Sequence, residues 1–482
     1  MHTHTSTQNT CFIDQDNNTA RAQTHALCES QWRQTCESTL HAMGTKMERF
    51  ASGPEGNLGV LEQALAGDMN ELLRNACERA AQAKADATPP KCPHCGTALT
   101  NKKHAQPREY LSRFGPIRIS RTRGYCPKCH EWKSPADTLL GLDQSAGRTP
   151  LMQEMSALLA SKMPVQEASV VLEKLSSIKI PPATLAREAQ RQGRRAIKQR
   201  DELDAKAVAP PRPQGAAPYE LVVLIDAWNI RERDHWGQSA TLRSQGKEPE
   251  RWHWVYTATC FRLDQRGKSA GGRPEITERG YVATRGGIES LREQLHAETL
   301  RRGLGKAREV LVIADGAAWI WNLVEERFPH ARQRLDYYHA LQHLAAVGRA
   351  VCGEDAKALR AWLRPLARKL KRSKTLQVIS SIEQVLESLG GRKEALQVRE
   401  QLEYFKKQQK RMDYAQGEHQ GEPIGSGAIE ATCRQYQCRF KRPGQFWSQT
   451  GDEALLCLET FWRNQRWSLL YPHTHPPDPS NN

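Results

Sequence analysis

The sequence has 482 residues, more than a single hydrophobic core organises, so we expect several modules. Lysine and arginine exceed aspartate and glutamate by 70 − 54 = 16. This excess favours a polyanionic partner, with nucleic acid as the first candidate, and the alternative is a basic surface kept for solubility. No stretch approaches the roughly 20 apolar residues of a membrane span, the polar N-terminus does not resemble a signal peptide, and scattered cysteines suit a reducing cytoplasm.

The N-terminal region divides into two parts. Residues 1–30 are polar and aperiodic, so we expect disorder there. Residues 31–88 are predicted to be helical, because apolar residues recur at three- and four-residue steps between Leu58 and Leu73. We favour packing of this helix within its own domain over an oligomer contact.

Residues 89–135 combine short alternating strands with two cysteine pairs. Each Cys-x-x-Cys turn aims two sulfurs at one point, and four thiolates can hold zinc in a tetrahedron. A β-hairpin over residues 108–125 would fill the gap between the pairs, as in a zinc ribbon. A redox dithiol is the alternative, disfavoured by the two matched pairs. We therefore expect a structural Zn²⁺ on Cys92, Cys95, Cys126 and Cys129.

Residues 148–205 are predicted to form helices, two of which flank a short turn near Pro181-Pro182. This arrangement is typical of a helix-turn-helix module, in which the second helix reads DNA. An ordinary helical hairpin with a solvated basic face is the alternative. The predicted DNA contacts of the second helix are Thr184, Arg187, Arg191 and Arg194. A proline-rich linker follows at residues 206–218.

Residues 219–470 are expected to form an α/β core with a sheet of mixed strand direction. Helices are expected at about 288–302 and 317–328, and every segment from Tyr337 to about Tyr414 is predicted to be helical. Residues 471–482 are expected to be a disordered tail. The predicted strands are Glu220–Ile225, His253–Leu263, Gly280–Thr284, Val310–Ala314 and Arg332–Leu335.

Three carboxylates stand out in this core. Asp226 and Asp315 each end an apolar run, and Glu430 lies where a late helix begins. Two rigid strand-end carboxylates and one helical carboxylate offer the hard oxygen ligands that Mg²⁺ or Mn²⁺ prefers. Each acid alone could be a turn former, a helix cap or a partner of a helix dipole. The prediction of a metal site therefore rests on the three together.

Four motifs around these acids resemble those of bacterial insertion-sequence transposases with an RNase H-like DDE core, close to the Mutator-like group. They are Asp226-Ala-Trp-Asn, Ala314-Asp-Gly-Ala-Ala-Trp-Ile-Trp, Asp336-Tyr-Tyr-His339 and Ile424-Gly-Ser-Gly-Ala-Ile-Glu430. The resemblance covers about residues 90–465 and includes Lys441-Arg-Pro-Gly-Gln-Phe-Trp. It implies an RNase H-like mixed sheet, with Asp226, Asp315 and Glu430 as ligands of Mg²⁺ or Mn²⁺ and an all-helical insertion at about residues 340–420.

The resemblance also implies a role near the acids for Asp336 and His339, for which a strand-end cap and a surface histidine are the alternatives. Arg434, one helical turn after Glu430, is expected to order that carboxylate or touch the scissile phosphate. Trp319 is the candidate base-stacking side chain. Phosphate contacts are predicted for Arg439, Lys441 and Arg442, with a solvated helix face as the alternative.

By resemblance, the chain is expected to be a DNA transposase of the bacterial cytoplasm, associated with the nucleoid. It would bind the terminal inverted repeats of its element, cleave the ends with Mg²⁺ and join them to target DNA, working as a homo-oligomer on double-stranded DNA. Two alternatives remain: an RNase H-like nuclease or resolvase without strand transfer, and a non-catalytic, transposase-derived DNA-binding protein. The intact acids argue against the last.

Overall fold

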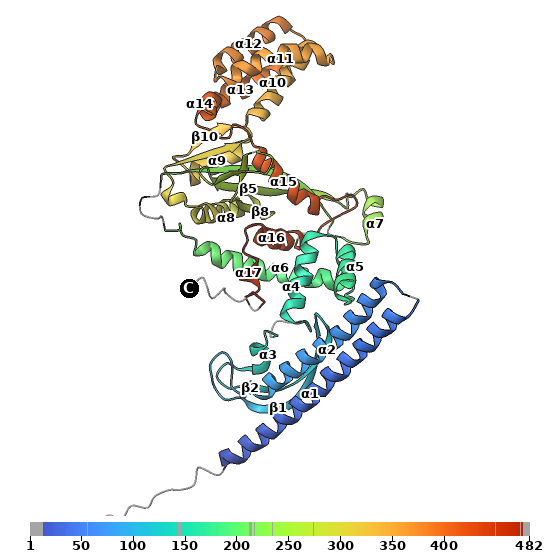
Figure 1. Cartoon of the computed structure of the whole chain (residues 1–482). Coiled ribbons are helices and arrows are strands. Elements are labelled where there is room, and N and C mark those ends of the chain that lie inside the picture. Colours follow the sequence, from blue (N-terminus) through green and yellow to red (C-terminus); the bar gives the residue numbers. More distant parts are fainter. Residues whose placement is uncertain are drawn as a thin grey trace, which may run out of the picture. The chain divides into compact units, whose positions relative to one another are not determined.

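The computed structural model describes residues 13–54, 56–142, 146–211, 215, 217–233, 235–272, 274–448, 450–472 and 474–475 (Figure 1). The chain divides into two compact units, and we describe each by itself. The first contains Met1–Met155 and Val170–Ile180, and the second contains Ser156–Ser169 and Pro181–Asn482. Among the described helices, none combines the length and the apolar character needed to cross a bilayer.

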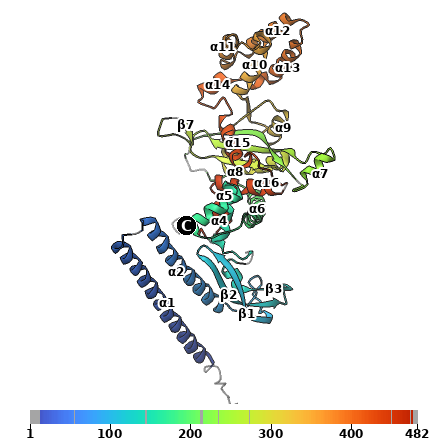
Figure 2. The same cartoon turned by 90° about the vertical axis from the view of Figure 1, so that its right-hand side faces the viewer.

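The first unit begins with two long helices, α1 (Ile13–Ser52) and α2 (Leu58–Asp86), which lie side by side (Figures 1 and 2). Lys46 on α1 binds the carboxylate of Asp68 on α2 at 2.6 Å. The expectation of disorder over residues 1–30 is wrong from Ile13 onward, because a polar segment without proline continues as helix; residues 1–12 lie outside the described residues.

A three-stranded antiparallel sheet follows, made of β1 (Thr100–Ser112), β2 (Gly115–Cys126) and β3 (Glu131–Lys133). The hairpin expected over residues 108–125 is present and extends further on its first strand. Side chains from α2, β1, β2 and the short helix α3 (Pro135–Leu139) form a small core under this sheet. The hairpin carries one cysteine pair just before β1 and the other at the β2–β3 turn.

Helices α4 (Pro150–Lys162), α5 (Val165–Ser176) and α6 (Pro182–Ala205) form as predicted. In the second unit, α6 packs closely on α16 (Gly451–Arg463). A Cβ on Gly193 would lie 2.5 Å from the Cβ of Ala454, so this crossing requires glycine. The basic helix is therefore fixed to the α/β core along one of its sides.

The second unit is built on a five-stranded sheet with the order β10-β9-β4-β5-β8 (Figure 1). The strands are β4 (Glu220–Glu232), β5 (Arg251–Arg262), β8 (Gly280–Thr284), β9 (Glu309–Ala314) and β10 (Arg332–Leu335). β4, β5 and β8 are antiparallel neighbours, whereas β4, β9 and β10 are parallel neighbours. The predicted α/β sheet of mixed direction is confirmed. A separate ribbon joins β6 (Arg266–Lys268) to β7 (Pro274–Ile276).

Alternate residues of β4 enter two different cores, as the period of a strand requires. Val223 and Ile225 pack with α8 (Gly287–Arg301) and α9 (Ala318–Arg327). Val222 and Leu224 pack on the other face with α15 (Gly427–Phe440), α16 and α6. The sheet is therefore covered by helices on both sides.

A helical insertion separates β10 from α15, as expected for about residues 340–420 (Figure 2). Its helices are α10 (Tyr337–Cys352), α11 (Ala356–Lys371), α12 (Thr375–Leu389), α13 (Glu394–Gln408) and α14 (Tyr414–His419). The chain leaves the sheet and returns to it at one place, where the N–H of Tyr337 donates to the carbonyl of Ile424 at 3.0 Å.

The chain ends on the short helix α17 (Trp467–Leu470). The expectation of disorder from residue 471 onward is wrong at Tyr471, which is buried with its ring 5.2 Å from that of Trp467. Residue 473 and residues 476–482 lie outside the described residues.

Candidate active site and metal centre

Asp226 and Asp315 follow the last residue pair of the parallel β4–β9 ladder. That ladder ends where Ile225 pairs with Ala314, so the two aspartates occupy the next position on neighbouring strands. β9 ends before Asp315 as predicted, but β4 does not end at Ile225. It continues to Glu232 because its antiparallel pairing with β5 persists, with Asp226 opposite Thr257.

Each aspartate is oriented by local donors. Oδ1 of Asp226 accepts the N–H of Ala227 at 2.7 Å, and Oδ2 accepts the thiol of Cys433 at 3.6 Å. Oδ1 of Asp315 accepts the N–H of Ala317 at 2.9 Å, at the start of α9. The turn-former interpretation therefore describes one oxygen of Asp315, and the N-cap position of α9 is Ala317.

Glu430 lies in the first turn of α15, on the same face of the sheet as Asp226. Its Oε1 lies 2.9 Å from the hydroxyl oxygen of Ser426, and Arg434 lies 3.7 Å from Oε2. Burial, aided by the negative charges of Asp315 and Glu430, raises the pKa of Asp226 to about 6. The carboxylate of Asp226 therefore lies in the field of the other two charges.

The spacing of these acids bears on how many ions they could hold. Among the described residues, they do not form a set whose ligand atoms all lie within 4.8 Å of one another. Ligands of a single Mg²⁺ lie within about 4.2 Å of one another, given Mg–O distances of about 2.1 Å. As placed here, the three carboxylates therefore do not all reach one Mg²⁺.

Asp336 is a buried helix cap. Its Oδ1 accepts the N–H of Tyr338 at 2.8 Å, at the start of α10, and its Oδ2 contacts the hydroxyl of Ser426. The Ser426 hydroxyl has one proton, so it donates either to Asp336 or to Glu430, and it lies between the start of the insertion and the start of α15. The strand-end-cap interpretation describes its contacts.

His339 is held by a second histidine. Its Nε2 lies 3.2 Å from Nε2 of His343, and Nδ1 of His343 lies 2.6 Å from Oε1 of Gln401 on α13. Since an amide oxygen only accepts, Nδ1 of His343 donates and its Nε2 accepts from His339. His343 is neutral in this arrangement, and burial lowers its pKa.

Tyr404 brings the insertion against the acids. Its ring stacks on His343 with centroids 3.7 Å apart, and a Cβ on Gly316 would lie 2.3 Å from that ring. The hydroxyl is buried and has no hydrogen-bond partner in the described part of the chain. Burial, aided by the charges of Asp315 and Asp336, raises its pKa.

Sequence reasoning missed four of these contacts. Cys433 could have been found, because it lies three residues after Glu430 and so shares its helix face. His343 was equally accessible, four residues after His339. Gln401 and Tyr404 carry no local signal, because only the folding of the insertion brings them to the acids.

The two accessory candidates near the acids are partly accessible. Trp319 is half-buried and meets Tyr256 edge to face at 5.2 Å. The side chain of Arg434 is 79% exposed. Its position beside Glu430 is compatible with ordering that carboxylate.

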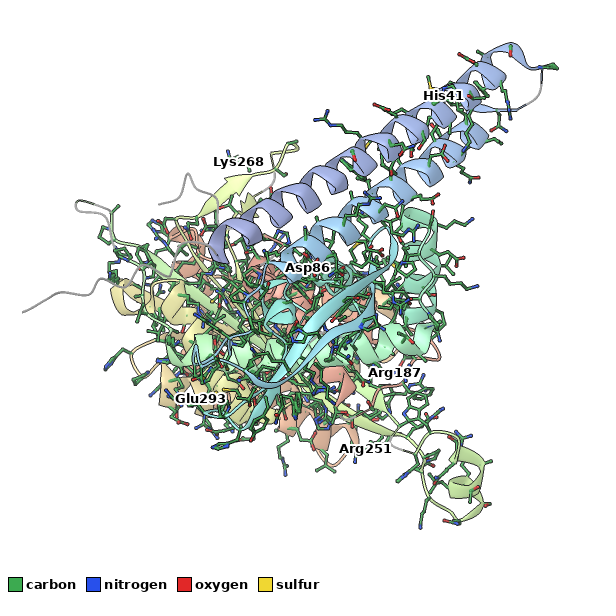
Figure 3. The ribbon with its side chains drawn as sticks, turned by 90° about the horizontal axis from the view of Figure 1, so that it is seen from below. His41, Asp86, Arg187, Arg251, Lys268 and Glu293 are labelled. Carbon is green, nitrogen blue, oxygen red and sulfur yellow. The ribbon has the colours of Figure 1, made fainter. Side chains whose placement is uncertain are left out.

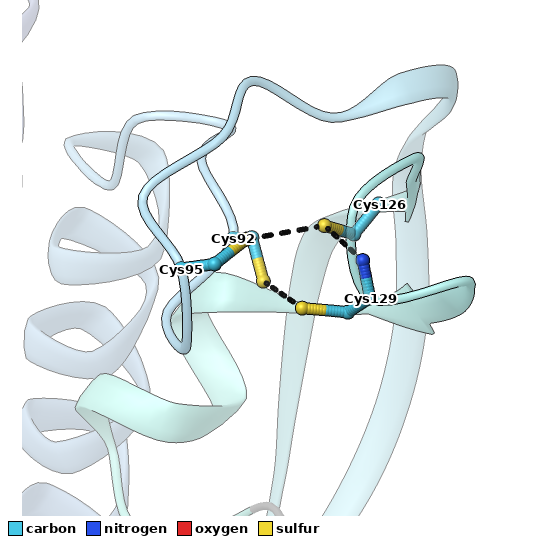
Figure 4. Close-up of side chains that lie close together, drawn as sticks. All are labelled: Cys92, Cys95, Cys126 and Cys129. Carbon is cyan, nitrogen blue, oxygen red and sulfur yellow. Dashed lines mark hydrogen bonds between the residues drawn. The ribbon is translucent and has the colours of Figure 1, made fainter.

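The four predicted zinc ligands converge (Figure 4). Sγ of Cys92 lies 3.8 Å from Sγ of Cys129, and Sγ of Cys95 lies 3.5 Å from Sγ of Cys126. Zn–S bonds of about 2.3 Å in a tetrahedron require sulfurs about 3.8 Å apart, so the spacing fits. This cluster can bind a structural metal such as zinc.

Each cysteine pair forms the same turn. Gly96 N–H donates to the carbonyl of Cys92, and His130 N–H donates to that of Cys126, both at 2.9 Å. Gly96 and His130 both have positive φ, at 73° and 56°. The two knuckles therefore present their sulfurs alike.

The predicted phosphate contacts after Glu430 need one correction. Arg439 is buried, and its guanidinium donates to the carbonyl of Ala160 at 2.8 and 3.3 Å, because α15 packs on α4 here. Burial lowers its pKa to about 10. Lys441 is exposed and bonds Asn229 at 3.0 Å, and Arg442 pairs with Glu167 at 2.9 Å.

The basic face of α6 is also partly engaged. Arg191 binds the buried carboxylate of Glu188 at 2.6 Å, so it stabilises the helix packing. Arg187 is exposed (Figure 3). It donates to half-buried Thr184 at 3.2 Å, and Arg194 is exposed. Of the four predicted DNA contacts, Arg187 and Arg194 are the most accessible.

Comparison with known proteins finds a distant relative. Over 349 residues, the chain is 24% identical to a protein of Streptococcus gallolyticus described as "UPF0236 protein in vanSb 3'region". The match covers 71% of this chain and 70% of that protein. No family model matches the chain.

Proposed function

We propose that the protein is a DNA transposase with an RNase H-like core, which cleaves the ends of its element and joins them to target DNA. The observation that carries the proposal is the adjacency of Asp226 and Asp315 at the end of the β4–β9 ladder, with α15, which carries Glu430, contacting Asp226 through Cys433. The sheet order, three antiparallel strands followed by two parallel ones, supports the RNase H-like assignment.

Asp226, Asp315 and Glu430 would hold Mg²⁺ or Mn²⁺. When bound, the metal supplies activation of a water or a 3′-hydroxyl and stabilisation of the leaving oxygen. The protein's own residues orient these ligands: Ala227 and Cys433 for Asp226, Ala317 for Asp315 and Ser426 for Glu430. Such a site would accelerate the reaction by positioning the reacting groups and by neutralising the charge that develops on them.

The DNA-binding parts of the proposal rest on charge and on the accessory modules. The zinc-ribbon-like cysteine cluster and the exposed arginines of α6 would bind the terminal inverted repeats, and Lys441 and Arg442 would contact phosphates. A homo-oligomer on DNA, acting on the bacterial nucleoid, belongs to the same proposal.

The deciding experiment uses duplexes that carry the inverted repeats bracketing the gene. With Mg²⁺, the wild type should nick these ends, and Asp226→Asn, Asp315→Asn and Glu430→Gln should each lower the rate at least about 100-fold while retaining DNA binding. The matched control is Glu418→Gln, which removes an exposed carboxylate that pairs with Lys371. An Asp226→Asn protein that still cleaves would refute the site.

A second assay separates transposase from nuclease. A pre-nicked end with a free 3′-hydroxyl, incubated with supercoiled plasmid, should become covalently joined to it. Cleavage without joining would favour the nuclease or resolvase alternative. Binding without either reaction would favour the non-catalytic alternative.

A further inference from the structure

The second unit carries an exposed row of aromatic side chains that ends near Asp315. Trp252, Trp254 and Tyr256 alternate along β5 and therefore project from one face of the sheet. Trp252 and Trp254 are 58% and 52% exposed. Tyr256 is half-buried and meets Trp319 edge to face. We call these four side chains the tryptophan row.

The inner end of the row lies near the start of α9. Tyr256 pairs across the strands with Ala227, so it lies on the face of the sheet opposite to that of Asp226. Trp319 lies in the first turn of α9, just after Asp315, which accepts the N–H of Ala317. A strand lying along the row would therefore lead to Asp315.

Positive charge and a polar amide flank the outer end. Arg231 lies 5.6 Å and Lys441 lies 5.7 Å from the ring centroid of Trp252. Lys441 also holds Asn229, which pairs across the strands with Trp254.

The arginines here outnumber their acidic partners. Glu250 is the shared ion-pair partner of Arg231, Arg233 and Arg243, which leaves 3 − 1 = 2 positive charges in excess. Arg251, at the start of β5, is also at the surface (Figure 3). An anionic partner with flat apolar faces matches this surface.

We propose that the tryptophan row binds the bases of an unpaired DNA strand leading towards Asp315, with Arg231 and Lys441 on its phosphates. Bases in a duplex stack on one another, whereas an unpaired strand exposes its base faces to aromatic side chains, and each such stack contributes about 1–3 kcal/mol. The proposal rests on the proposed function only for the use of the strand in cleavage.

The test measures binding of the full-length protein, without Mg²⁺, to a labelled single-stranded oligonucleotide and to an abasic strand of equal length. The wild type should bind the base-containing strand at least about fivefold more tightly, as one stack predicts. The double change Trp252→Ala and Trp254→Ala should abolish this preference, whereas Trp254→Phe should largely keep it. Trp462→Ala, which removes a tryptophan 44% exposed on α16, is the matched control and should leave the preference unchanged.

Three outcomes would overturn the proposal: equal wild-type affinity for the two strands, a base preference that survives in the double variant, or a double variant whose only defect is altered self-association in sizing experiments. The last would make the row a protein contact. Failure of the proposed function would appear separately, as duplex cleavage that is insensitive to Asp226→Asn.

Discussion

The thiol of Cys433 lies 3.6 Å from Oδ2 of Asp226, so α15 reaches the first aspartate as well as supplying Glu430. Burial and the adjacent charge of Asp226 raise the pKa of the thiol, which keeps it protonated as a donor. Cys433 and Glu430 lie three residues apart on one helix face. The orientation of Asp226 and the position of Glu430 are therefore set by the same helix.

Cys433→Ala should lower the cleavage rate by about 2- to 10-fold, the effect of losing one neutral hydrogen bond. Cys433→Ser keeps a donor and should retain more activity. Cys438→Ala, on an exposed cysteine of the same helix, is the control. Initial rates at saturating DNA measure the effect. Equal rates for the Ala variant and the wild type would show that the contact does not orient Asp226.

Gly316→Ala should reduce both stability and cleavage, because its Cβ would collide with Tyr404 at 2.3 Å. Overpacking of this kind destabilises by about 1–3 kcal/mol. The double change Gly316→Ala and Tyr404→Ala should relieve the collision, and Gly305→Ala, at a glycine with open space, is the control. Thermal unfolding and nicking rates provide the measurements. Full activity of Gly316→Ala would contradict the contact.

Tyr404→Phe should leave stability unchanged or raise it by about 1 kcal/mol, because it removes a buried hydroxyl without a partner among the described residues. Its effect on cleavage shows whether the hydroxyl is used. If the variant loses stability, the hydroxyl must have a partner in solution. Urea unfolding gives the comparison.

Cys92→Ser should release zinc, because a structural site needs all four thiolates. Folding and metal binding are coupled in such modules, so the first unit should also become protease-sensitive. Cys36→Ser changes a cysteine outside the cluster and should retain the metal. Metal analysis of the purified proteins is decisive, and an unchanged zinc content in Cys92→Ser would refute the ribbon.

Arg187 and Arg191 should behave differently. Arg191→Ala leaves the buried carboxylate of Glu188 without its cation and should lower stability by about 1–3 kcal/mol. Arg187→Ala removes an exposed side chain and should change stability by less than about 0.5 kcal/mol, while weakening DNA binding and reducing its salt dependence. Unfolding curves and salt titrations separate the two. A destabilised Arg187→Ala would reverse the assignment.

The free energy of unfolding should fall as the pH rises from about 4 to about 8. Burial, opposed by Arg285 and aided by the carboxylate of Glu232, raises the pKa of Asp452 to about 8 from 3.8. The folded protein then binds a proton that the unfolded chain has lost over this range, so its stability decreases as that proton leaves. Asp452→Asn should flatten the dependence. A profile that is identical in both proteins would exclude this pair as its cause.

Core strands such as Val310–Ala314 could be predicted because they are short apolar runs bounded by polar residues. The end of β4 was misplaced because Asp226 interrupts the run. Trp228 and Ile230 resume a two-residue alternation that continues the strand. Asp226 and Asp315, which follow apolar runs on neighbouring parallel strands, were therefore identifiable from the sequence pattern. Glu430 was identifiable only from its motif.

Whether each basic residue is buried or exposed could not be predicted from the sequence. Arg439 and Arg442 look alike in the sequence, yet one donates to a buried carbonyl and the other pairs at the surface. Which of them faces solvent depends on α4, hundreds of residues earlier in the chain. Long-range packing of this kind produces no periodic pattern in the sequence.

The hydrogen bond between Tyr337 and Ile424 makes the insertion a loop with fixed ends. Its outer helices, α11 and α12, can lengthen, shorten or be exchanged without moving Glu430, since the two ends of the insertion stay joined at the same point. α10 and α13 lack this freedom, because they carry His343 and Tyr404 to the acids. The outer half of the insertion is thus the natural place to graft a reporter or a new DNA-targeting domain.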